Sequence, residues 1–458
     1  MSEKTASLST TIEALVEGRK FTTLRDVLTT MNPSDIAYVF EDLDEASLPL
    51  LFRLLPKELA ADTFVEMEPD LQELLIRGFS DSELKAVVDE LYVDDAVDLV
   101  EEMPANVVKR ILRQTDPDTR KMINELLQYP DDSVGSIMTT EYVNLTPGMT
   151  VTQAQDHIRK YGVDKETINT CYVTDKSNHL IGAISIRTII LSDPDSLVEE
   201  RMEPNVISVT TSTDKEEAAQ MFSKYNFTSI PVVDTETRLV GIVTVDDAIE
   251  VINEEASEDM EIMGGMTPSE KPYLRMPVGR IWMNRIPWLL LLMVSATFTG
   301  LIITHFENAL AANLALTMFI PMLMDTGGNS GSQSSVTVIR SLSLGDIEFS
   351  DILTVIWKEF RVAVLSGVSL GAVGFGKIML IDRLLMGNTS ITLPVAFAVC
   401  LTLVLVVITA KVVGCSLPML AEKIGFDPAV MASPVITTSV DALALLIYFR
   451  IASAILSF

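Results

Sequence analysis

The chain has 458 residues, with 63 acidic side chains, 34 basic ones and a net charge of −29. This length allows roughly two to four domains. The charge is uneven, because residues 276–458 hold equal numbers of acids and bases and the first 275 residues carry the whole excess of acid. So acidic a part argues against binding to nucleic acid or anionic lipid and favours cations. Three cysteines without a Cys-x-x-Cys pair exclude a disulfide framework and a zinc site.

Residues 1–135 are predicted to form an acidic domain made only of helices. Apolar side chains recur at helical spacing, as at Ile36 and Phe40. A segment that begins at Asp35 is echoed by one that begins at Asp95, as expected of helix pairs stacked in a superhelical bundle. The first twenty residues lack the apolar segment of a signal peptide, so we expect the domain to stay in the cytoplasm.

Two α+β units with the same order of elements follow, at residues 136–200 and 201–256. The expected strands are Tyr142–Leu145, Thr170–Thr174 and a run from Leu180 in the first unit, and Val206–Val209, Ser229–Val233 and a run from Leu239 in the second. The main helices are expected at Val151–Tyr161 and Lys215–Tyr225. The runs Gly182-Ala-Ile-Ser-Ile-Arg, Ser229-Ile-Pro-Val-Val-Asp and Gly241-Ile-Val-Thr-Val-Asp-Asp resemble a tandem pair of CBS domains.

This resemblance implies ATP as an optional ligand. CBS pairs that bind adenine nucleotides have a Ser or Thr near the phosphates and an Asp three residues later on the ribose. The second unit has both, as Thr244 and Asp247. The first unit has Ser185 but carries Thr188 where the Asp is expected.

A connector is predicted at residues 257–283, as a helix between the second unit and the membrane. It continues a dense acidic helix that starts near Glu250, and Gly264, Gly265 and Pro268 loosen it. Arg275, Arg280 and Arg285 come just before the first apolar run, so the positive-inside bias places this end in the cytoplasm.

Residues 284–458 are predicted to be a transmembrane domain of five helices. A spanning helix needs roughly 20 mostly apolar residues. The uncharged or nearly uncharged runs are Trp288–Ile303, Ala311–Leu323, Val362–Phe375, Leu393–Ala410 and Pro428–Phe449. The third connection, at residues 382–392, falls outside, and the fourth, around Lys411 and Lys423, falls inside. The odd number of spans places the C-terminus outside the cell membrane.

Asp441 is the one ionisable residue in the last apolar run. A carboxylate at that depth costs on the order of 3 kcal/mol or more, so it normally faces a polar cavity or a partner. An ion path is therefore the first hypothesis. The alternative is an Asp buried against a neighbouring Ser, Thr or Arg as packing.

A second polar feature lies in the second apolar run, where Asp325, Asn329 and Gln333 follow one another at intervals of four residues. They share one helical face, and such groups cannot face lipid. The stripe is therefore interpreted as the wall of an aqueous path. The glycines among them would also suit a packing seam between helices.

The Gly-Gly-Asn-x-Gly-x-Gln-Ser run from Gly327, the CBS pair, the acidic helical domain and the Phe426-Asp-Pro-Ala … Asp441 run together resemble the MgtE family of magnesium channels. The resemblance implies a homodimer in the bilayer, with a Mg²⁺ pore on its two-fold axis and a cytosolic gate that senses Mg²⁺. It makes Asp441 the pore acid and Asp427 an acid at the pore mouth, with Ser433 and Pro434 also lining the pore.

The same resemblance assigns sensing acids to three parts of the chain. The expected set is Asp94, Asp95 and Asp98 in the helical domain, Asp214, Glu216 and Asp247 in the CBS region, and Glu250, Glu255, Glu258 and Asp259 in the connector. A pair of symmetry-related carboxylates fits the ion independently, because Mg²⁺ sheds water reluctantly and prefers oxygen ligands.

Three other functions are weighed. A different divalent ion, such as Co²⁺, Mn²⁺ or Ni²⁺, could use the same pore, although an all-oxygen site favours a hard cation. A CBS-regulated membrane enzyme is disfavoured because the chain lacks His-Glu-x-x-His and any nucleophile paired with histidine in the membrane. An anion channel is disfavoured by Asp441 and by the expected absence of a buried Lys or Arg.

Overall fold

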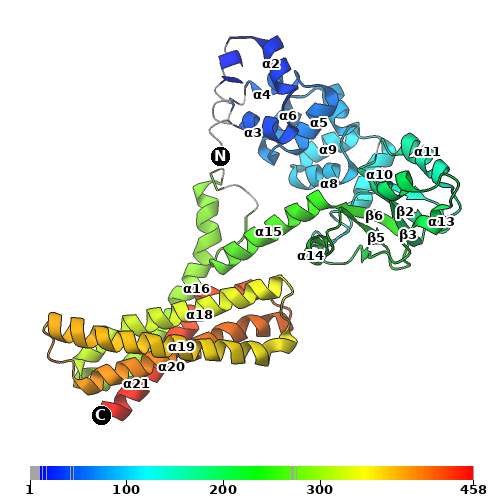
Figure 1. The fold of residues 1–458 in the computed structure, drawn as a ribbon. Helices are drawn as coiled ribbons and strands as arrows, with labels where there is room; N and C mark the ends of the chain where they lie inside the picture. The colour runs from blue at the N-terminus through cyan, green and yellow to red at the C-terminus, as the bar shows by residue number, and fades with distance from the viewer. Residues whose placement is uncertain are drawn as a thin grey trace. The chain divides into compact units, whose positions relative to one another are not determined.

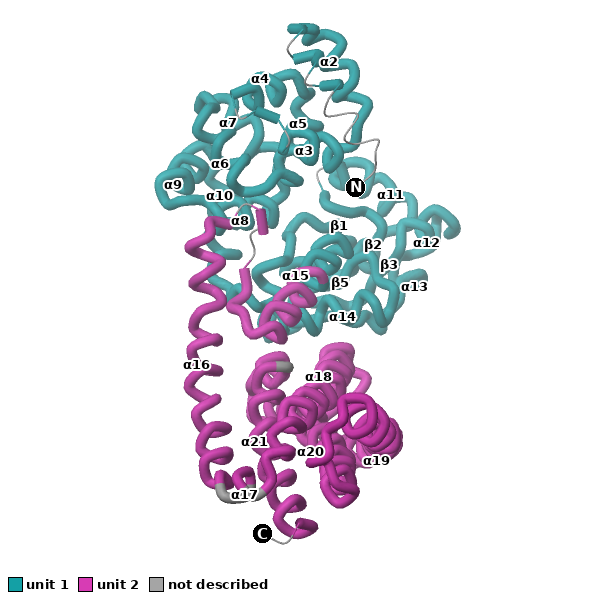
Figure 2. The backbone as a smooth tube through the Cα atoms, turned by 90° about the vertical axis from the view of Figure 1, so that its left-hand side faces the viewer, with its two compact units in different colours: residues 1–252 teal, residues 253–458 magenta. Residues whose placement is uncertain are grey.

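Figure 1 shows the fold in a computed structural model, which describes residues 11–12, 14–16, 18–41, 43–44, 46–163, 165–269, 273–274 and 276–456. Arg275 lies outside the described residues. The chain divides into two compact units, Met1–Ile252 and Asn253–Phe458, which Figure 2 shows in different colours.

The first unit begins with short helices, as predicted. They are α2 (Phe21–Leu28), α3 (Pro33–Glu41), α4 (Leu48–Phe52), α5 (Lys57–Val65), α6 (Pro69–Gly78), α7 (Asp81–Val88), α8 (Val93–Glu102), α9 (Ala105–Gln114) and α10 (Pro117–Leu126). Helix α3 packs on α5, α5 on α7, α7 on α9 and α8 on α10. Contact between elements two apart in sequence is what stacked helix pairs produce.

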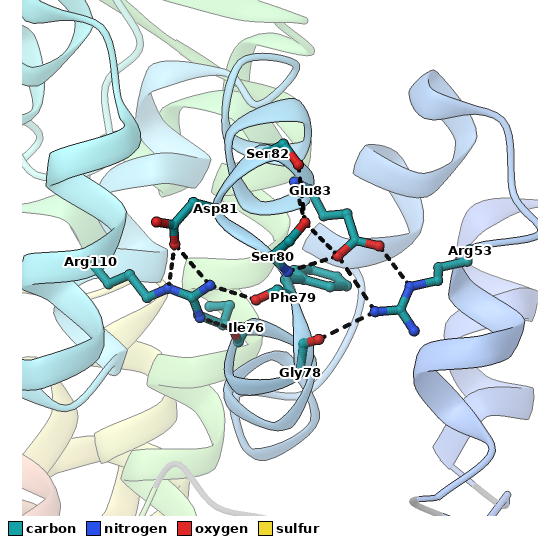
Figure 3. Close-up of polar contacts among 9 residues, drawn as sticks. All are labelled: Arg53, Ile76, Gly78, Phe79, Ser80, Asp81, Ser82, Glu83 and Arg110. Atoms are coloured by element: carbon teal, nitrogen blue, oxygen red, sulfur yellow. Dashed lines mark hydrogen bonds and ion pairs between the residues drawn. The ribbon is translucent and has the colours of Figure 1, made fainter.

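Two arginines tie these helices together, as Figure 3 shows. Arg53, which follows α4, pairs with Glu83 of α7 at 2.7 Å. Arg110 of α9 reaches Asp81 at 3.1 Å and donates to the carbonyl oxygens of Ile76 and Phe79. The last carbonyls of α6 are left without partners by the end of the helix, so Arg110 satisfies backbone groups as well as a charge.

The two CBS-like units each contain a three-stranded sheet. The first has β1 (Tyr142–Leu145), α11 (Val151–Tyr161), β2 (Thr167–Thr174), β3 (Leu180–Ser185), α12 (Ile186–Leu191) and α13 (Val198–Arg201), and the second has β4 (Val209–Thr210), α14 (Lys215–Tyr225), β5 (Ser229–Val233), β6 (Leu239–Thr244) and α15 (Val245–Met263). In each sheet the middle strand pairs parallel to the first and antiparallel to the third.

Most of the predicted bounds agree with these elements, and the main differences are at two strands. Strand β2 starts three residues before the expected Thr170, and β4 lies at Val209–Thr210 rather than Val206–Val209. One apolar core runs from the helical domain into the second sheet, where it includes Ile230 and Val243. The helical domain and the second CBS-like unit therefore share one apolar core.

The second unit contains the end of α15, then α16 (Val278–His305), α17 (Glu307–Ala312), the 3₁₀ turn η1 (Leu314–Phe319), α18 (Ile320–Ser343), η2 (Phe349–Asp351), α19 (Ile352–Lys377), the π-helical η3 (Ile378–Leu385), α20 (Leu393–Lys423), η4 (Pro428–Met431) and α21 (Ser433–Leu456). Four helical segments among the described residues are long and apolar enough to cross a membrane: Val278–His305, Phe349–Leu385, Leu393–Lys423 and Pro428–Leu456. Helix α18 is too polar to be counted with them.

Two expectations about this region are wrong. The connector is not one helix over 257–283, because α15 ends at Met263 and α16 begins at Val278. Gly265 has a positive φ of 70°, which ends a helix readily, and Pro277 precedes the next one. Lys411 does not lie in a connection between spans, because it is buried inside α20.

The three cysteines, Cys171, Cys400 and Cys415, are all free and buried. For Cys400 and Cys415, which lie in an apolar run of the sequence, this agrees with the expectation that they are small core residues.

Candidate ion path and ion-sensing site

Asp441 lies near the middle of α21, and its side chain is half-buried. The charged group that acts on it is Asp325 of α18, so the two carboxylates are close enough to repel each other. Among the described residues, no ion pair or side-chain hydrogen bond joins Asp441 to a Ser, Thr or Arg, so the alternative of a packed Asp finds no support there. Two carboxylates that repel each other would be stabilised by a divalent cation between them.

The predicted polar stripe is present on α18. Asp325, Asn329 and Gln333 are all exposed along one face of the helix, and Asn329 donates its amide to Asp325 Oδ1 at 3.0 Å. They line a hollow of about 590 Å³. Its other lining residues come from the same helix, from α19 and from α20: Thr326, Ser330, Leu365, Ser366, Ser369, Leu370 and Lys411. The hollow is large enough for a cation with its water.

The glycines of α18 lie on the opposite face and serve packing, as the alternative reading proposed for them. A Cβ on Gly328 would lie 3.1 Å from Thr437 of α21. A Cβ on Gly331 would lie 2.6 Å from Ile436. Helix α18 therefore has a packing face and a polar face, and close packing on the first presents the second to the hollow.

At the start of α21, the backbone is shaped by Asp427 and Pro434. Asp427 is exposed and accepts a hydrogen bond from the Ala429 amide at 2.7 Å, so it caps the turn η4. The carbonyl oxygen of Pro434 accepts bonds from Thr437 and Thr438. The side chain of Ser433 lies outside the described residues.

The end of α15 packs in this region. Ile262 and Met263 lie against a small buried cluster of Ile339, Ala429 and Ala432. The connector therefore reaches the ends of α18 and α21 with apolar side chains.

Sequence reasoning missed a buried ion pair in the same unit. Lys411 of α20 lies 3.8 Å from Glu359 of α19, with side chains 7% and 16% exposed. The expectation of no buried Lys or Arg is therefore wrong. The sequence did contain an indication of this buried lysine, because Lys411 is flanked on both sides by apolar residues of one helix. Because Glu359 neutralises it, the pair adds no net positive charge to the unit.

In the first unit, carboxylates from the helical domain and from the second CBS-like unit lie together. This acidic cluster consists of Asp94, Asp95, Asp98, Glu141, Glu166, Asp246, Asp247 and Glu250, whose charges act on one another. Helix α8 supplies three of them, two of which lie in its first turn, and α15 supplies another three. The structure thus brings together four sequence-predicted acids with the connector's Glu250.

The pKa values within the cluster are raised by burial and, secondly, by the neighbouring acids. Burial and the charges around them raise the pKa of Asp95 to about 7 and that of Glu166 to about 8. Asp98 keeps contact with water, yet the surrounding protein and the acids Asp95 and Glu250 raise its pKa to about 8. Asp247 is raised less, to about 6, because Thr244 donates hydrogen bonds to it. A cluster so costly to ionise would be stabilised by a cation.

Asp94 gives a more specific indication. Its side chain is buried, and its Oδ1 atom has no hydrogen-bond partner. An orphaned carboxylate oxygen fits a hard cation or its bound water. No three Asp, Glu, His or Cys side chains among the described residues already converge as a complete set of metal ligands, so water would complete the shell.

The remaining predicted acids are placed elsewhere. Asp214 is exposed and caps α14 by accepting the Glu216 amide at 2.8 Å. Neither is among the main charges that act on Asp95 or Asp98. Glu255, Glu258 and Asp259 belong to the second unit, on the later turns of α15. Glu166 was missed because it precedes β2 in a loop, far in sequence from the other acids.

The predicted nucleotide residues are in contact in the second CBS-like unit. Thr244 Oγ1 donates to Asp247 Oδ2 at 2.6 Å. In the first unit the corresponding contact joins two hydroxyls, Ser185 and Thr188, at 2.9 Å. A carboxylate for a ribose is thus present in the second unit, and it also belongs to the acidic cluster.

Comparison with known families covers most of the chain. Residues 320–451 match the MgtE family model, described as a divalent cation transporter. Residues 31–132 match the MgtE intracellular N domain, and residues 134–194 and 198–254 each match the CBS domain. The tandem CBS pair inferred from the sequence is confirmed.

Curated relatives match over nearly their whole length. The magnesium transporter MgtE of Thermus thermophilus is 36% identical, over 97% of this chain and 97% of its own. That of Bacillus subtilis is 32% identical, over 96% and 95%. Among solved structures, the cytosolic domain of the Mg²⁺ channel MgtE in complex with ATP is 38% identical, with a TM-score of 0.50, over 52% of this chain and 97% of its own. The soluble part of a magnesium transporter is 31% identical, with a TM-score of 0.51, over 55% and 99%.

Proposed function

The chain belongs to the MgtE family of magnesium transporters, and on this premise we propose that it is a Mg²⁺-selective channel for magnesium uptake, gated by Mg²⁺ in the cytosol. The observation that carries the proposal is that Asp441 lies close enough to Asp325, which lines the polar hollow, for the two carboxylates to repel each other. Mg²⁺ is the cargo of this path and would pass with most of its water, held by carboxylate and carbonyl oxygens.

The path is completed by a second copy of the chain. In a homodimer with a two-fold axis, each residue on the axis meets its own copy. Helices α18 and α21 would then line the pore from both subunits and present two Asp441 side chains to one ion. Asp427, Ser433 and Pro434 would lie towards its cytoplasmic mouth, where the packing of Met263 against Ala429 and Ala432 offers an apolar plug.

We place five helices per subunit in the cell (inner) membrane. Four are apolar enough to be recognised as spans. The fifth is α18, whose 24 residues reach about 36 Å, enough for a hydrocarbon core of about 30 Å. Its polar face would be shielded from lipid by the pore. The helical and CBS domains would be cytoplasmic, and the C-terminus outside.

Gating would depend on the acidic cluster. At low Mg²⁺ its carboxylates repel one another, and bound Mg²⁺ would hold the helical domain against the CBS pair and stabilise the closed state. Support comes from the raised pKa values and from the orphaned Asp94 oxygen. Asp214, Glu216, Glu255, Glu258 and Asp259 are proposed as further sensor acids.

The test of the transport function is Mg²⁺ influx into vesicles that contain the purified full-length chain. Replacing Asp441 with Asn keeps the shape and removes the charge, and should lower influx by tenfold or more, because an ion deep in the membrane loses a charged ligand. Asp346→Asn, an exposed acid in the turn after α18, should keep native influx. Native influx through Asp441→Asn would refute the proposal.

A different divalent cation is the second candidate, favoured by the broader description of the family model. Influx of each divalent cation, measured separately at equal concentration, tests this candidate. If Co²⁺, Mn²⁺ or Ni²⁺ enters the same vesicles faster than Mg²⁺ at equal concentration, the chain is not Mg²⁺-selective.

ATP is proposed as a ligand of the second CBS-like unit, with Thr244 near the phosphates and Asp247 on the ribose. A solved relative bound to ATP supports this, as does the intact Thr244–Asp247 contact. Calorimetric titration of ATP into the full-length chain in detergent tests it, and the absence of heat at millimolar ATP would exclude it.

A further inference from the structure

Three helices of the second unit meet at one buried polar contact. Lys411 Nζ of α20 donates to Ser334 Oγ of α18 at 3.2 Å, and Ser334 Oγ donates to Glu359 Oε2 of α19. The ammonium and the carboxylate are themselves 3.8 Å apart. Among the described residues, Lys411 is the only buried base.

The lysine of this contact also faces the hollow. It lines the same 590 Å³ space as Asp325, Asn329 and Gln333. An ammonium on that wall would repel a divalent cation, and the repulsion is strong where water is scarce. Glu359 is the acid that cancels it, from the side of Lys411 that faces α19.

Resting on the function proposed above, we propose that Glu359 and Lys411 form a charge-balanced pair that sets how strongly the hollow attracts Mg²⁺. Glu359 is a positioning residue, since it acts through Lys411 rather than on the ion. With both charges present, Asp325 and Asp441 determine the local field. Conduction requires that the ion is attracted strongly enough to enter and is bound weakly enough to leave. An unpaired Lys411 ammonium would weaken entry, and an unpaired Glu359 carboxylate would slow exit.

Glu359→Gln and Lys411→Gln should therefore reduce Mg²⁺ transport for opposite electrostatic reasons. Glu359→Gln leaves an uncompensated ammonium, which opposes entry of the ion. Lys411→Gln leaves an uncompensated carboxylate, so Mg²⁺ should saturate transport at a lower concentration but leave more slowly, with a lower maximal rate. The double variant restores the balance of charge.

A purely structural role would give another result. Removing one partner of a buried ion pair is destabilising, and replacing both can be neutral. Loss of packing would, however, reduce transport of every ion alike. An electrostatic barrier scales with the charge of the ion, so Mg²⁺ should be affected more than Na⁺.

The experiment measures influx of Mg²⁺, and of Na⁺ without divalent ions, into vesicles that contain the full-length chain. We expect Glu359→Gln to lower Mg²⁺ influx by about tenfold and Na⁺ influx by about threefold. The double variant should return to within about twofold of native. Asp346→Asn serves as the control for loss of one exposed carboxylate.

Native Mg²⁺ influx through Glu359→Gln, equal losses of Mg²⁺ and Na⁺ influx, or a double variant no better than the worse single one would each overturn the pair's role. Asp441→Asn in the same series separates this from the transport function itself. Influx that is insensitive to Asp441→Asn refutes the function and the pair together, whereas sensitive influx without rescue refutes only the pair.

Discussion

On α8, Asp95 and Asp98 lie three residues apart and face the same group of acids. Asp95 is partly covered, and Asp98 keeps contact with water, so a hydrated cation can reach both. Desolvation by the surrounding protein is the first cause of their raised pKa values, and the acid neighbours are the second. Both effects penalise the ionised form of the two carboxyl groups, and a bound divalent cation would relieve both.

Replacing Asp95 and Asp98 together with Asn should imitate the cation-bound state. Without Mg²⁺, the first unit of the variant should melt several degrees higher than the native first unit, because two costly charges are gone. It should also gain less protection from proteolysis when Mg²⁺ is added. Thermal melting and limited trypsin digestion with and without EDTA measure both effects.

Glu90→Gln is the matched control, since it removes one exposed acid from the residues just before α8. It should melt as the native chain does and keep its response to Mg²⁺. If the double Asn variant responded to Mg²⁺ as strongly as native protein, Asp95 and Asp98 would not be sensor residues.

At the scale of elements, α18 has one face that packs against other helices and one face that lines a polar hollow. Its glycines pack against α20 and α21, and its Asp, Asn and Gln line the hollow. The approach is closest at Gly414 of α20, where a Cβ would lie 2.3 Å from the carbonyl oxygen of Gly331. The spacing of these helices therefore has no room for a methyl group.

Gly331→Ala should accordingly force α18 away from Ile436 of α21. Overpacking of this kind costs about 1–3 kcal/mol, so we expect a lower melting temperature in detergent and a loss of transport. Gly376→Ala on α19 is the control, because a Cβ there meets nothing within 4 Å. Equal melting temperatures for the two variants would contradict tight packing at Gly331.

The elements of the CBS-like units could be predicted closely because local signals agree with the fold. Thr150 and Gln153 form a capping box at the start of α11, and Asp214 caps α14. The pairing of Lys411 with Glu359 could not be predicted in this way. They are far apart in sequence, and only the packing of α19 on α20 brings them together. Glu166 was missed for the same reason.

At the scale of the whole molecule, the chain separates a strongly acidic half from a neutral apolar half. The half that carries the charge also carries the continuous core from the helical domain to the second sheet. Its stability should therefore depend on pH through the acidic cluster. The sequence predicted which half would be acidic, while the convergence of these acids depends on the tertiary fold.

The sign of that dependence follows from the pKa values. Asp95, Asp98 and Glu166 bind protons more tightly in the folded state, with pKa values of about 7, 8 and 8, than in the unfolded chain, where about 4 is usual. The free energy of unfolding therefore decreases as the pH rises from the unfolded-state pKa of about 4 to the folded-state values of about 7 to 8. Without divalent ions, the melting temperature of the first unit should fall from about pH 5 to about pH 8.

Millimolar Mg²⁺ should flatten this decline, because the cation replaces the protons. Melting curves at several pH values, with EDTA and with Mg²⁺, test it. A melting temperature that rises with pH in EDTA, or a slope that Mg²⁺ leaves unchanged, would contradict the account.

The burial of Cys171, Cys400 and Cys415 has a practical use. Burial raises the pKa of the Cys171 thiol to about 12, so this sulfur reacts slowly with alkylating reagents. A pair of new cysteines at exposed positions, such as Glu90 and Asp214, could be spin-labelled in the native background. Distance measurements by double electron–electron resonance on such a pair would test whether the two positions move apart or together as the Mg²⁺ concentration changes.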